Sequence, residues 1–381
     1  MDLKLNGEQI LLQEALSRFL SDRYTFEKRR VRIARNGALD AEIWREFADS
    51  LGILGAALPE EVGGMAGGPV EVMVIMEALG QSLVVEPYLE TAVLGGGLLK
   101  RCKERCASTL LAKIVAGEAR IAFASAEPMT RYALNDVSTT ARREGSGWIL
   151  NGAKSVVDAA PSATHFIVTA RTSGERRDRH GISLFVVEKQ NPDIQAHEYR
   201  LIDDRFAADL NFSGIVLPAD ALIGSEGNAL PLIEQVIDEA TVAVCAEAVG
   251  GMRRMLGDTV EYTRQRTQFG QPLATFQVLQ HRMVDMYMCL EEAISAVCLA
   301  TLKLDAEPAQ RAKAVSAAKV TIGRSARMIG QNAVQLHGGM GMTDELAVGH
   351  YFKRATVIEN QFGTVDHHLA RYAALCRTEA A

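Results

Sequence analysis

The chain has 381 residues, 48% of them hydrophobic and 23% charged, which is enough to bury a sizeable core and to form two or three domains. Its formal net charge of -6 gives no basic excess, which argues against nucleic acid or an anionic membrane surface as a partner. The N-terminus is polar, no apolar run approaches the ~18 residues that span a membrane, and the six cysteines are scattered, so we expect a cytoplasmic protein with reduced thiols and no metal site.

Residues 1–120 are predicted to form an N-terminal helical domain. Apolar residues from Leu11 to Leu20 recur at helical spacing, and Asp40 is expected to cap a second helix that contains Trp44. A loop at Leu58–Gly64 follows. Further helices are predicted over Pro69–Leu83, Leu89–Lys100 and Ser108–Ala116.

Residues 121–226 change to short β-prone runs, which predict a middle domain built as an antiparallel sheet or small barrel. The Asn151-Gly152 dipeptide lies between two such runs and is typical of a type I′ hairpin turn. The expected strands are Ile121–Ser125, Val137–Ala141, Trp148–Leu150, Phe166–Ala170, Ile182–Val187 and Ala208–Phe212.

Residues 227–381 return to long amphipathic helices, which predict a C-terminal four-helix bundle. The expected fold is therefore mainly α with a central β domain. A Rossmann fold is excluded, because no glycine-rich loop lies between a parallel strand and a helix. The predicted helices are Pro231–Gln265, Phe276–Asp305, Pro308–His337, Asp344–Glu359 and Val365–Thr378.

Five motifs occur in order along the whole chain, and together they resemble the acyl-CoA dehydrogenase family. The motifs are Leu58–Gly64, Glu127-Pro128, Asn151–Lys154, Arg266–Gly270 followed by Gln277 and Gln280, and Gln335–Gly341. The run Thr343–Arg354 is most similar to the small subunits of pimeloyl-CoA dehydrogenase-type and steroid side-chain enzymes. The glycine cluster Gly338–Gly341 would be weak evidence alone, since a helix C-cap explains it equally well.

The resemblance implies FAD-dependent α,β-dehydrogenation of an acyl-CoA thioester, with an electron-transfer flavoprotein as the acceptor. It also implies a tetramer, because in the family these C-terminal motifs reach the flavin of a neighbouring subunit. The arginine fork of Arg266 would hold the diphosphate, although a surface ion pair with Glu261 would explain this residue as well. The cofactor-binding positions that the resemblance carries over are Arg266, Phe269, Gln277, Gln335, Gly338, Gly339 and Thr364.

The chain departs from the family pattern around the expected flavin ring. The usual Trp-Ile-Thr run is Val156-Val157-Asp158 here, and the glycine-rich continuation after Glu127-Pro128 is Met129–Ala133. These changes remove an aromatic side chain and place a carboxylate near the electron-rich flavin edges, where it would disfavour a reduced, anionic flavin.

The catalytic base is the larger departure. One branch of the family has its carboxylate where this chain has Phe362, and the other has it at the position that aligns with Ala240. Neither side chain accepts a proton. Glu247 lies two helical turns after Ala240 in an apolar stretch and is a weak candidate base. A structural ion pair, with Arg324 or Arg327, is the favoured interpretation of Glu247.

Three functions remain open from the sequence. The first is a catalytically incomplete subunit that completes a homologous partner's FAD site. The second is a self-sufficient homo-oligomeric dehydrogenase with a displaced base such as Glu247. The third is a scaffold that binds acyl-CoA without catalysis. The adjacent histidines His367 and His368 are predicted to be surface residues.

Overall fold

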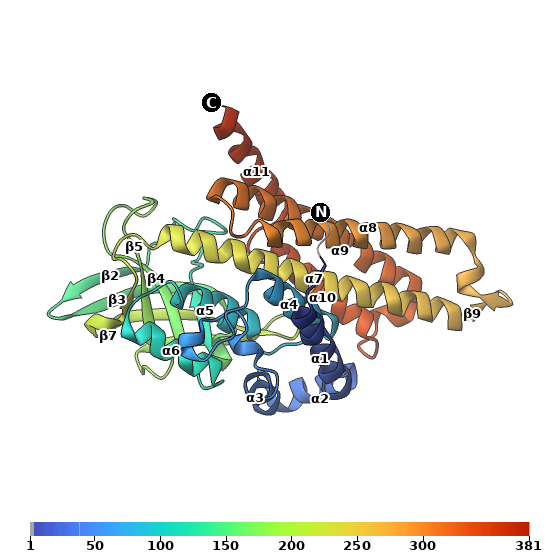
Figure 1. Ribbon diagram of the computed structural model, residues 1–381, viewed down its shortest axis with the longest axis horizontal. Helices are drawn as coiled ribbons and strands as arrows, with labels where there is room; N and C mark the ends of the chain where they lie inside the picture. The colour runs from blue at the N-terminus through green and yellow to red at the C-terminus, as the bar shows by residue number, and fades with distance from the viewer. Residues whose placement is uncertain (1–3, 38, 381) are drawn as a thin grey trace. The chain divides into compact units, whose positions relative to one another are not determined.

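The computed structural model describes residues 4–37 and 39–380 (Figure 1). These residues divide into two compact units. One unit is formed within residues 1–31, 69–84 and 241–381, and the other within residues 32–68 and 85–240. The division into an N-terminal domain 1–120, a middle domain 121–226 and a C-terminal domain 227–381 stays a prediction.

The N-terminal third is helical, as expected. Asp40 caps α3, because its carboxylate accepts hydrogen bonds from the amides of Glu42 and Ile43. The predicted helix Leu89–Lys100 begins instead as a buried π-helix, Leu89–Gly95. The α-helices are α1 (Gly7–Arg23), α2 (Phe26–Asn36), α3 (Ala41–Asp49), α4 (Pro69–Gln81), α5 (Gly96–Leu99) and α6 (Arg105–Val115).

The middle segment forms one eight-stranded sheet in the order β6-β7-β3-β2-β4-β5-β8, with β1 paired to β4. The β1–β4 and β2–β4 pairs are parallel, and the other pairs are antiparallel. A core that includes Trp148, Phe166, Phe185 and Phe212 fills the sheet unit. The strands are β1 (Ile121–Ala124), β2 (Thr140–Glu144), β3 (Gly147–Asp158), β4 (His165–Arg171), β5 (Ile182–Glu188), β6 (Ile194–Arg200), β7 (Phe206–Leu217) and β8 (Leu222–Ile223).

The predicted hairpin at Asn151-Gly152 is wrong. The chain continues through this dipeptide in the single strand β3, and the register against β7 shifts between Leu150 and Gly152. Gly152 has φ of 147°, and a Cβ there would lie 2.5 Å from the Thr139 hydroxyl oxygen. Glycine is therefore needed for an irregularity within a strand and not for a turn.

Two of the motifs meet in a buried ion pair of the sheet unit. Lys154 Nζ lies 2.7 Å from Glu127 Oε1 and also donates to the Thr169 hydroxyl at 2.8 Å. The Glu127 carboxylate accepts further hydrogen bonds from the amides of Ser138 and Thr139, at 2.8 and 3.0 Å. The buried charges are therefore matched by hydrogen bonds, which is the condition for placing them inside a protein.

Acid should weaken the fold through Glu127. Burial alone would raise the pKa of this carboxyl group. The charge of the Lys154 ammonium and the hydrogen bonds that the carboxylate accepts instead lower its pKa from 4.5 to about 2. The unfolded chain then binds more protons in this interval, so the stabilisation is complete above pH 4.5 and is lost as the pH falls toward 2. Against Glu127→Gln, the wild-type free energy of unfolding should fall more steeply in acid, by up to about 1.4 kcal/mol per pH unit. Urea denaturation across this pH range measures both slopes, and equal slopes would exclude Glu127 as the source.

The C-terminal third consists of long helices, as the sequence predicts. The helices α8, α10 and α11 each pack against α9, and Pro308 opens α9 where a missing amide is tolerated. Close backbone contact joins α4 to α7, because a Cβ on Gly80 would lie 2.0 Å from the Glu247 carbonyl oxygen. The helices are α7 (Leu230–Gln265), α8 (Gln277–Leu302), α9 (Pro308–His337), α10 (Ala347–Asn360) and α11 (Val365–Ala380), with the short hairpin β9 (Thr267–Gln268) and β10 (Gln271–Pro272) between α7 and α8.

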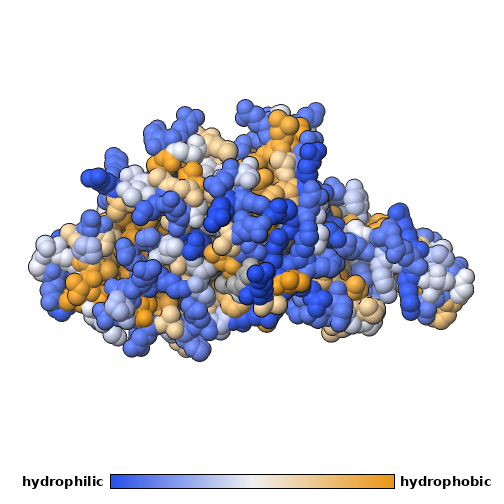
Figure 2. Space-filling model, turned by 90° about the horizontal axis from the view of Figure 1, so that it is seen from below, coloured by the Kyte–Doolittle hydropathy of each residue, from blue (hydrophilic) through white to orange (hydrophobic). Residues whose placement is uncertain are grey.

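Hydrophobic and hydrophilic residues alternate over the face drawn in Figure 2, where the hydrophobic ones form small separate groups. Within residues 4–37 and 39–380, no helix has both the length and the apolar character that crossing a membrane requires.

Candidate functional site

A cavity of about 800 Å³ opens at the end of the α7–α8 helix pair. Its walls come from the last turn of α7, the β9–β10 hairpin, the first turns of α8, the end of α9 and the 3-10 helix η7 (Gly338–Met342). All these elements belong to one compact unit. The cavity therefore joins two of the sequence motifs, Arg266–Gly270 and Gln335–Gly341, which lie about 70 residues apart in the chain.

Arg266 offers the cavity an unneutralised guanidinium group. Its backbone ends α7 and accepts a hydrogen bond from the Leu273 amide at 2.9 Å, which fixes the start of the hairpin. The side chain is exposed and forms no ion pair among the described residues; Glu261, the alternative partner, instead accepts from Gln265 at 2.5 Å. Arg282 is the second cation in the wall, and the lining contains no Asp or Glu.

The glycine segment opposite Arg266 leaves its backbone accessible. Gly338 ends α9 with φ 62° and ψ -142°, a conformation that only glycine adopts readily. A Cβ on Gly338 or Gly339 would meet no atom within 4 Å. A ligand can therefore approach this main chain closely, and Gln335, one turn earlier on α9, also lines the cavity.

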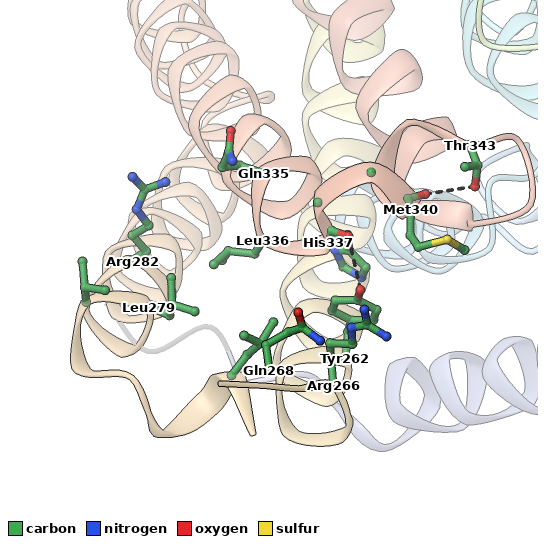
Figure 3. Close-up of a pocket in the computed structure, with 14 residues that line it drawn as sticks. Tyr262, Arg266, Gln268, Leu279, Arg282, Gln335, Leu336, His337, Met340 and Thr343 are labelled. Atoms are coloured by element: carbon green, nitrogen blue, oxygen red, sulfur yellow. Dashed lines mark hydrogen bonds between the residues drawn. The ribbon is translucent and has the colours of Figure 1, made fainter. Parts of the chain in front are cut away.

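Tyr262 and His337 brace the glycine segment against α7. Their rings stack with centroids 4.4 Å apart, and the Tyr262 hydroxyl donates to the His337 carbonyl oxygen at 3.3 Å. His337 Nδ1 lies 2.7 Å from the Ala333 carbonyl oxygen, so the ring is held from both sides. Figure 3 shows Arg266 beside this Tyr262–His337 pair, with Arg282 and Gln335 at the far side of the cavity.

Three of the predicted cofactor positions do not line this cavity. Phe269 is 90% exposed at the tip of the hairpin, where its ring meets Phe276 edge-on at 6.1 Å. Gln277 is the exposed first residue of α8. Thr364 precedes α11, and its hydroxyl accepts a hydrogen bond from the His367 amide at 3.2 Å. The cofactor roles of these three residues stay predictions.

The sequence reasoning missed Tyr262 and Arg282 as wall residues. Tyr262 lies four residues before Arg266 and therefore on the same helical face, a spacing that could have identified it. Arg282 follows Gln277 on α8 by five residues, which gives a weaker signal. Its guanidinium contacts the Asn332 side-chain oxygen at 3.4 Å.

The cavity fits the diphosphate part of a dinucleotide. Two arginines, Arg266 and Arg282, line the cavity without any carboxylate in the wall, and a planar guanidinium pairs well with phosphate oxygens. The open glycine backbone gives phosphate or ribose the close approach that a side chain would block.

Neither base position carries a proton acceptor. Ala240 is fully buried in α7, and Phe362 lies in the turn before α11 with φ of 59°. Glu247 is buried and forms a two-pronged ion pair with Arg354, in which Nε and an Nη atom each lie 2.7 Å from a carboxylate oxygen. Glu247 thus forms a structural ion pair, but its partner is Arg354 and not the predicted Arg324 or Arg327. Arg327 pairs with Glu359.

The strand end that replaces the family's Trp-Ile-Thr run is held by polar groups of the sheet. The Val156 amide donates to the Asp209 carboxylate at 2.9 Å, and the Tyr199 hydroxyl donates to the same carboxylate oxygen. Val156 has φ of 50° and its side chain is 53% exposed. No aromatic ring is therefore offered by residues 156–158 at this point of the sheet.

Sequence comparison decides the family. Three family profiles match in order: "Acyl-CoA dehydrogenase, N-terminal domain" over residues 6–118, "middle domain" over 122–214 and "C-terminal domain" over 230–374. The acyl-CoA dehydrogenase FadE12 of Mycobacterium tuberculosis is 30% identical over 324 residues, covering 83% of this chain and 82% of its own length. The chain belongs to the acyl-CoA dehydrogenase family.

Other relatives extend the similarity over most of the chain. The human short-chain specific acyl-CoA dehydrogenase is 29% identical, covering 83% of this chain and 78% of its own. An FAD complex of PigA has a TM-score of 0.91 at 25% identity, with 100% of both chains covered. The Tcur3481-Tcur3483 steroid ACAD has a TM-score of 0.87 at 26% identity, with 98% of both covered.

Family membership makes this chain an FAD-dependent oxidoreductase and confirms the expected succession of helical, β and helical segments. The cavity lined by Arg266, Arg282 and the Gly338-Gly339 backbone has the side-chain chemistry that a diphosphate requires.

Gly339→Val should reduce flavin retention without unfolding the chain. A Cβ at this position meets no atom within 4 Å, so the thermal midpoint should stay within a few degrees of wild type. The side chain would nevertheless occupy the cavity wall, and FAD bound to the assembly co-expressed with a base-carrying homologue should fall by about tenfold or more. Gly257→Ala on α7 is the control, because it also enters open space but lies outside the cavity. Equal FAD content in both variants would show that this backbone does not approach the cofactor.

Proposed function

We propose that this chain is a subunit of a two-chain acyl-CoA dehydrogenase tetramer, in which it completes the FAD site of a homologous partner that carries the base. The observation that supports this most is Arg266, which has no ion-pair partner among the residues that the structure describes and lies in a wall free of carboxylates, in a chain whose two base positions hold Ala240 and Phe362. A diphosphate clamp without a base is expected in a subunit that serves a neighbour's site.

The proposed reaction is α,β-dehydrogenation of an acyl-CoA thioester. FAD held at this site would supply the acceptor for a hydride from the β-carbon, and a carboxylate would have to take the weakly acidic α-proton. In this account the partner provides that carboxylate. Arg266 and the Gly338-Gly339 backbone would hold the diphosphate and so fix the position of the cofactor. Phe269, Gln277 and Thr364, which do not line the cavity, would contact another part of the cofactor.

Exposed apolar residues on α8 support association with a second chain. Val284, Met288, Leu299 and Leu302 are each between 44% and 56% exposed and recur at spacings that share one helix face. An exposed apolar face of this kind is typical of a protein interface. Two structural neighbours are named as two-chain proteins, Tcur3481-Tcur3483 and the ChsE4-ChsE5 complex of Mycobacterium tuberculosis, the latter with a TM-score of 0.88.

The remaining parts of the proposal rest on the family. The acceptor would be an electron-transfer flavoprotein; one neighbour, at a TM-score of 0.90, comes from a structure titled as the electron transferring flavoprotein of Acidaminococcus fermentans. The acyl group would be a fatty, dicarboxylic or steroid side-chain thioester. We place the protein in the cytoplasm.

The alternative is a self-sufficient enzyme in which Glu247 is the base. The two-pronged ion pair with Arg354 weighs against it, because both carboxylate oxygens are already engaged and the ionised form is stabilised. A non-catalytic scaffold is weaker still, since it gives no reason for the unpaired guanidinium of Arg266.

Expression alone and with a base-carrying homologue tests the proposal. The chain alone should purify with little flavin and no turnover, and co-expression should restore both. Yellow, active protein from the single gene would support the Glu247 alternative. Absence of flavin in both preparations would support the scaffold.

A further inference from the structure

The turn Gln361–Gly363, which holds the family's base position, has an unusual backbone. Phe362 has φ of 59°, a left-handed conformation that costs a non-glycine residue about 1 kcal/mol or more. Gly363 has φ of 126°, and a Cβ there would lie 2.6 and 2.7 Å from atoms of His367 and His368. Such a conformation persists only where the surroundings determine it.

Buried side chains form hydrogen bonds to the backbone carbonyl groups in and beside this turn. Lys319, on α9 and 1% exposed, donates to the Gly363 carbonyl at 2.6 Å and to the Glu359 carbonyl at 3.1 Å. His368, also 1% exposed, has Nε2 3.1 Å from the Phe362 carbonyl. His368 is therefore not the predicted surface residue: its ring points back under the turn from the first turn of α11.

The contacts of His368 also determine its tautomer. A carbonyl oxygen only accepts, so Nε2 carries the proton, and Nδ1, 3.3 Å from the Ser316 hydroxyl, accepts from it. Arg354 adds a third attachment, since its guanidinium lies 3.3 Å from the Gln361 side-chain oxygen while Glu247 fixes its position.

We propose that Lys319 and His368 are positioning residues that hold the carbonyls of Phe362 and Gly363, so that the residue at position 362 keeps a left-handed backbone and a fixed direction. The backbone arrangement that carries a base in other members of the family is thus kept here, with phenylalanine in place of the carboxylate residue. This inference rests on the proposed function, because that proposal identifies position 362 as one of the family's two base positions. The contacts themselves involve neither flavin nor a second chain.

Burial separates the pKa of Lys319 from those of Cys245 and His368. Burial lowers the pKa of Lys319 to about 8, while it lowers that of His368 to about 3 and raises that of Cys245 to about 12. Burial also lowers the pKa of His367. The charged and titratable groups that act on Lys319 and His368 are Cys245 on α7, Glu359 on α10, and His367 and Arg371 on α11.

Selective isotope labelling reports on this turn directly. The dipeptide Phe-Gly occurs twice, at Phe269-Gly270 and Phe362-Gly363. Labelling Phe with carbonyl ¹³C and Gly with ¹⁵N therefore gives two NMR cross-peaks, one from the turn and one from the exposed hairpin as an internal reference. The chain is used alone, and a pH series through about 8 is recorded for each variant.

We expect the Phe362-Gly363 peak to titrate near pH 8 in the wild type and to lose that titration in Lys319→Met. His368→Gln should shift its carbonyl frequency. Lys154→Met, which removes a buried lysine of the sheet unit, should leave the turn peak and its titration unchanged wherever that variant folds. The Phe269-Gly270 peak should be constant throughout.

A turn peak whose carbonyl frequency in His368→Gln, or in a folded Lys319→Met, equals that of the wild type would overturn the inference. The His368→Gln measurement decides even if Lys319→Met does not fold. Neither measurement depends on cofactor binding, so a failure here is separate from a failure of the proposed function.

Discussion

Replacing Arg266 with glutamine should deprive the assembled enzyme of its flavin. The side chain is exposed and unpaired among the described residues, so its loss should change the free energy of unfolding by no more than about 0.5 kcal/mol. Charge-assisted hydrogen bonds to a diphosphate are worth far more, and we expect FAD affinity to fall by roughly 100-fold. Titration calorimetry with FAD on the co-expressed, flavin-stripped assembly measures this directly.

Two further variants isolate the role of the Arg266 fork. Arg266→Lys keeps the charge but loses the planar pair of donors, so its affinity should lie between wild type and Arg266→Gln. Arg264→Gln removes an exposed arginine two residues away on α7 that does not line the cavity, and it should retain FAD fully. Equal losses of FAD affinity in the Arg264 and Arg266 variants would show that the effect comes from general surface charge and not from the Arg266 fork.

Arg354→Met should destabilise the fold strongly. It leaves the Glu247 carboxylate buried without its main partner, and breaking a buried pair from one side costs about 3–5 kcal/mol. The double variant Glu247→Leu with Arg354→Met should regain most of the lost stability, because neither charge of this pair then remains buried. Urea denaturation of the three proteins gives the coupling energy.

Arg327→Met is the matched control for Arg354→Met. Arg327 also pairs with a glutamate, but its side chain is 59% exposed, so the loss of unfolding free energy should stay within about 1 kcal/mol.

In the assembled enzyme, Glu247→Gln with an intact fold should retain turnover. Abolished turnover in that variant would instead identify Glu247 as the base and contradict its structural role.

Element boundaries were predictable where local chemistry marks them. The predicted helix Pro308–His337 is α9, because proline opens it and a glycine with left-handed φ ends it. The Asn151-Gly152 hairpin failed because the pairing of β3 with β7, more than 50 residues away, overrides a local turn preference. Strand β6 was missed because most of its side chains are exposed and show no alternation.

The candidate site was predictable where a motif carries its own chemistry. Arg266, Gln335, Gly338 and Gly339 line one cavity, and their role in binding the cofactor stays a prediction. The partner of Glu247 was not predictable, because Arg354 lies 107 residues away and the sequence does not give helix packing. Burial of a lysine is likewise a property of the packed bundle, and nothing local distinguishes Lys319 from a surface lysine.

A structure of the co-purified assembly with FAD tests the central claim most directly. We expect the FAD diphosphate to lie within hydrogen-bonding distance of Arg266 and beside the Gly338-Gly339 backbone, with the flavin ring held by the partner chain. A flavin ring on this chain's own residues 156–158, or a diphosphate that leaves Arg266 in solvent, would contradict it.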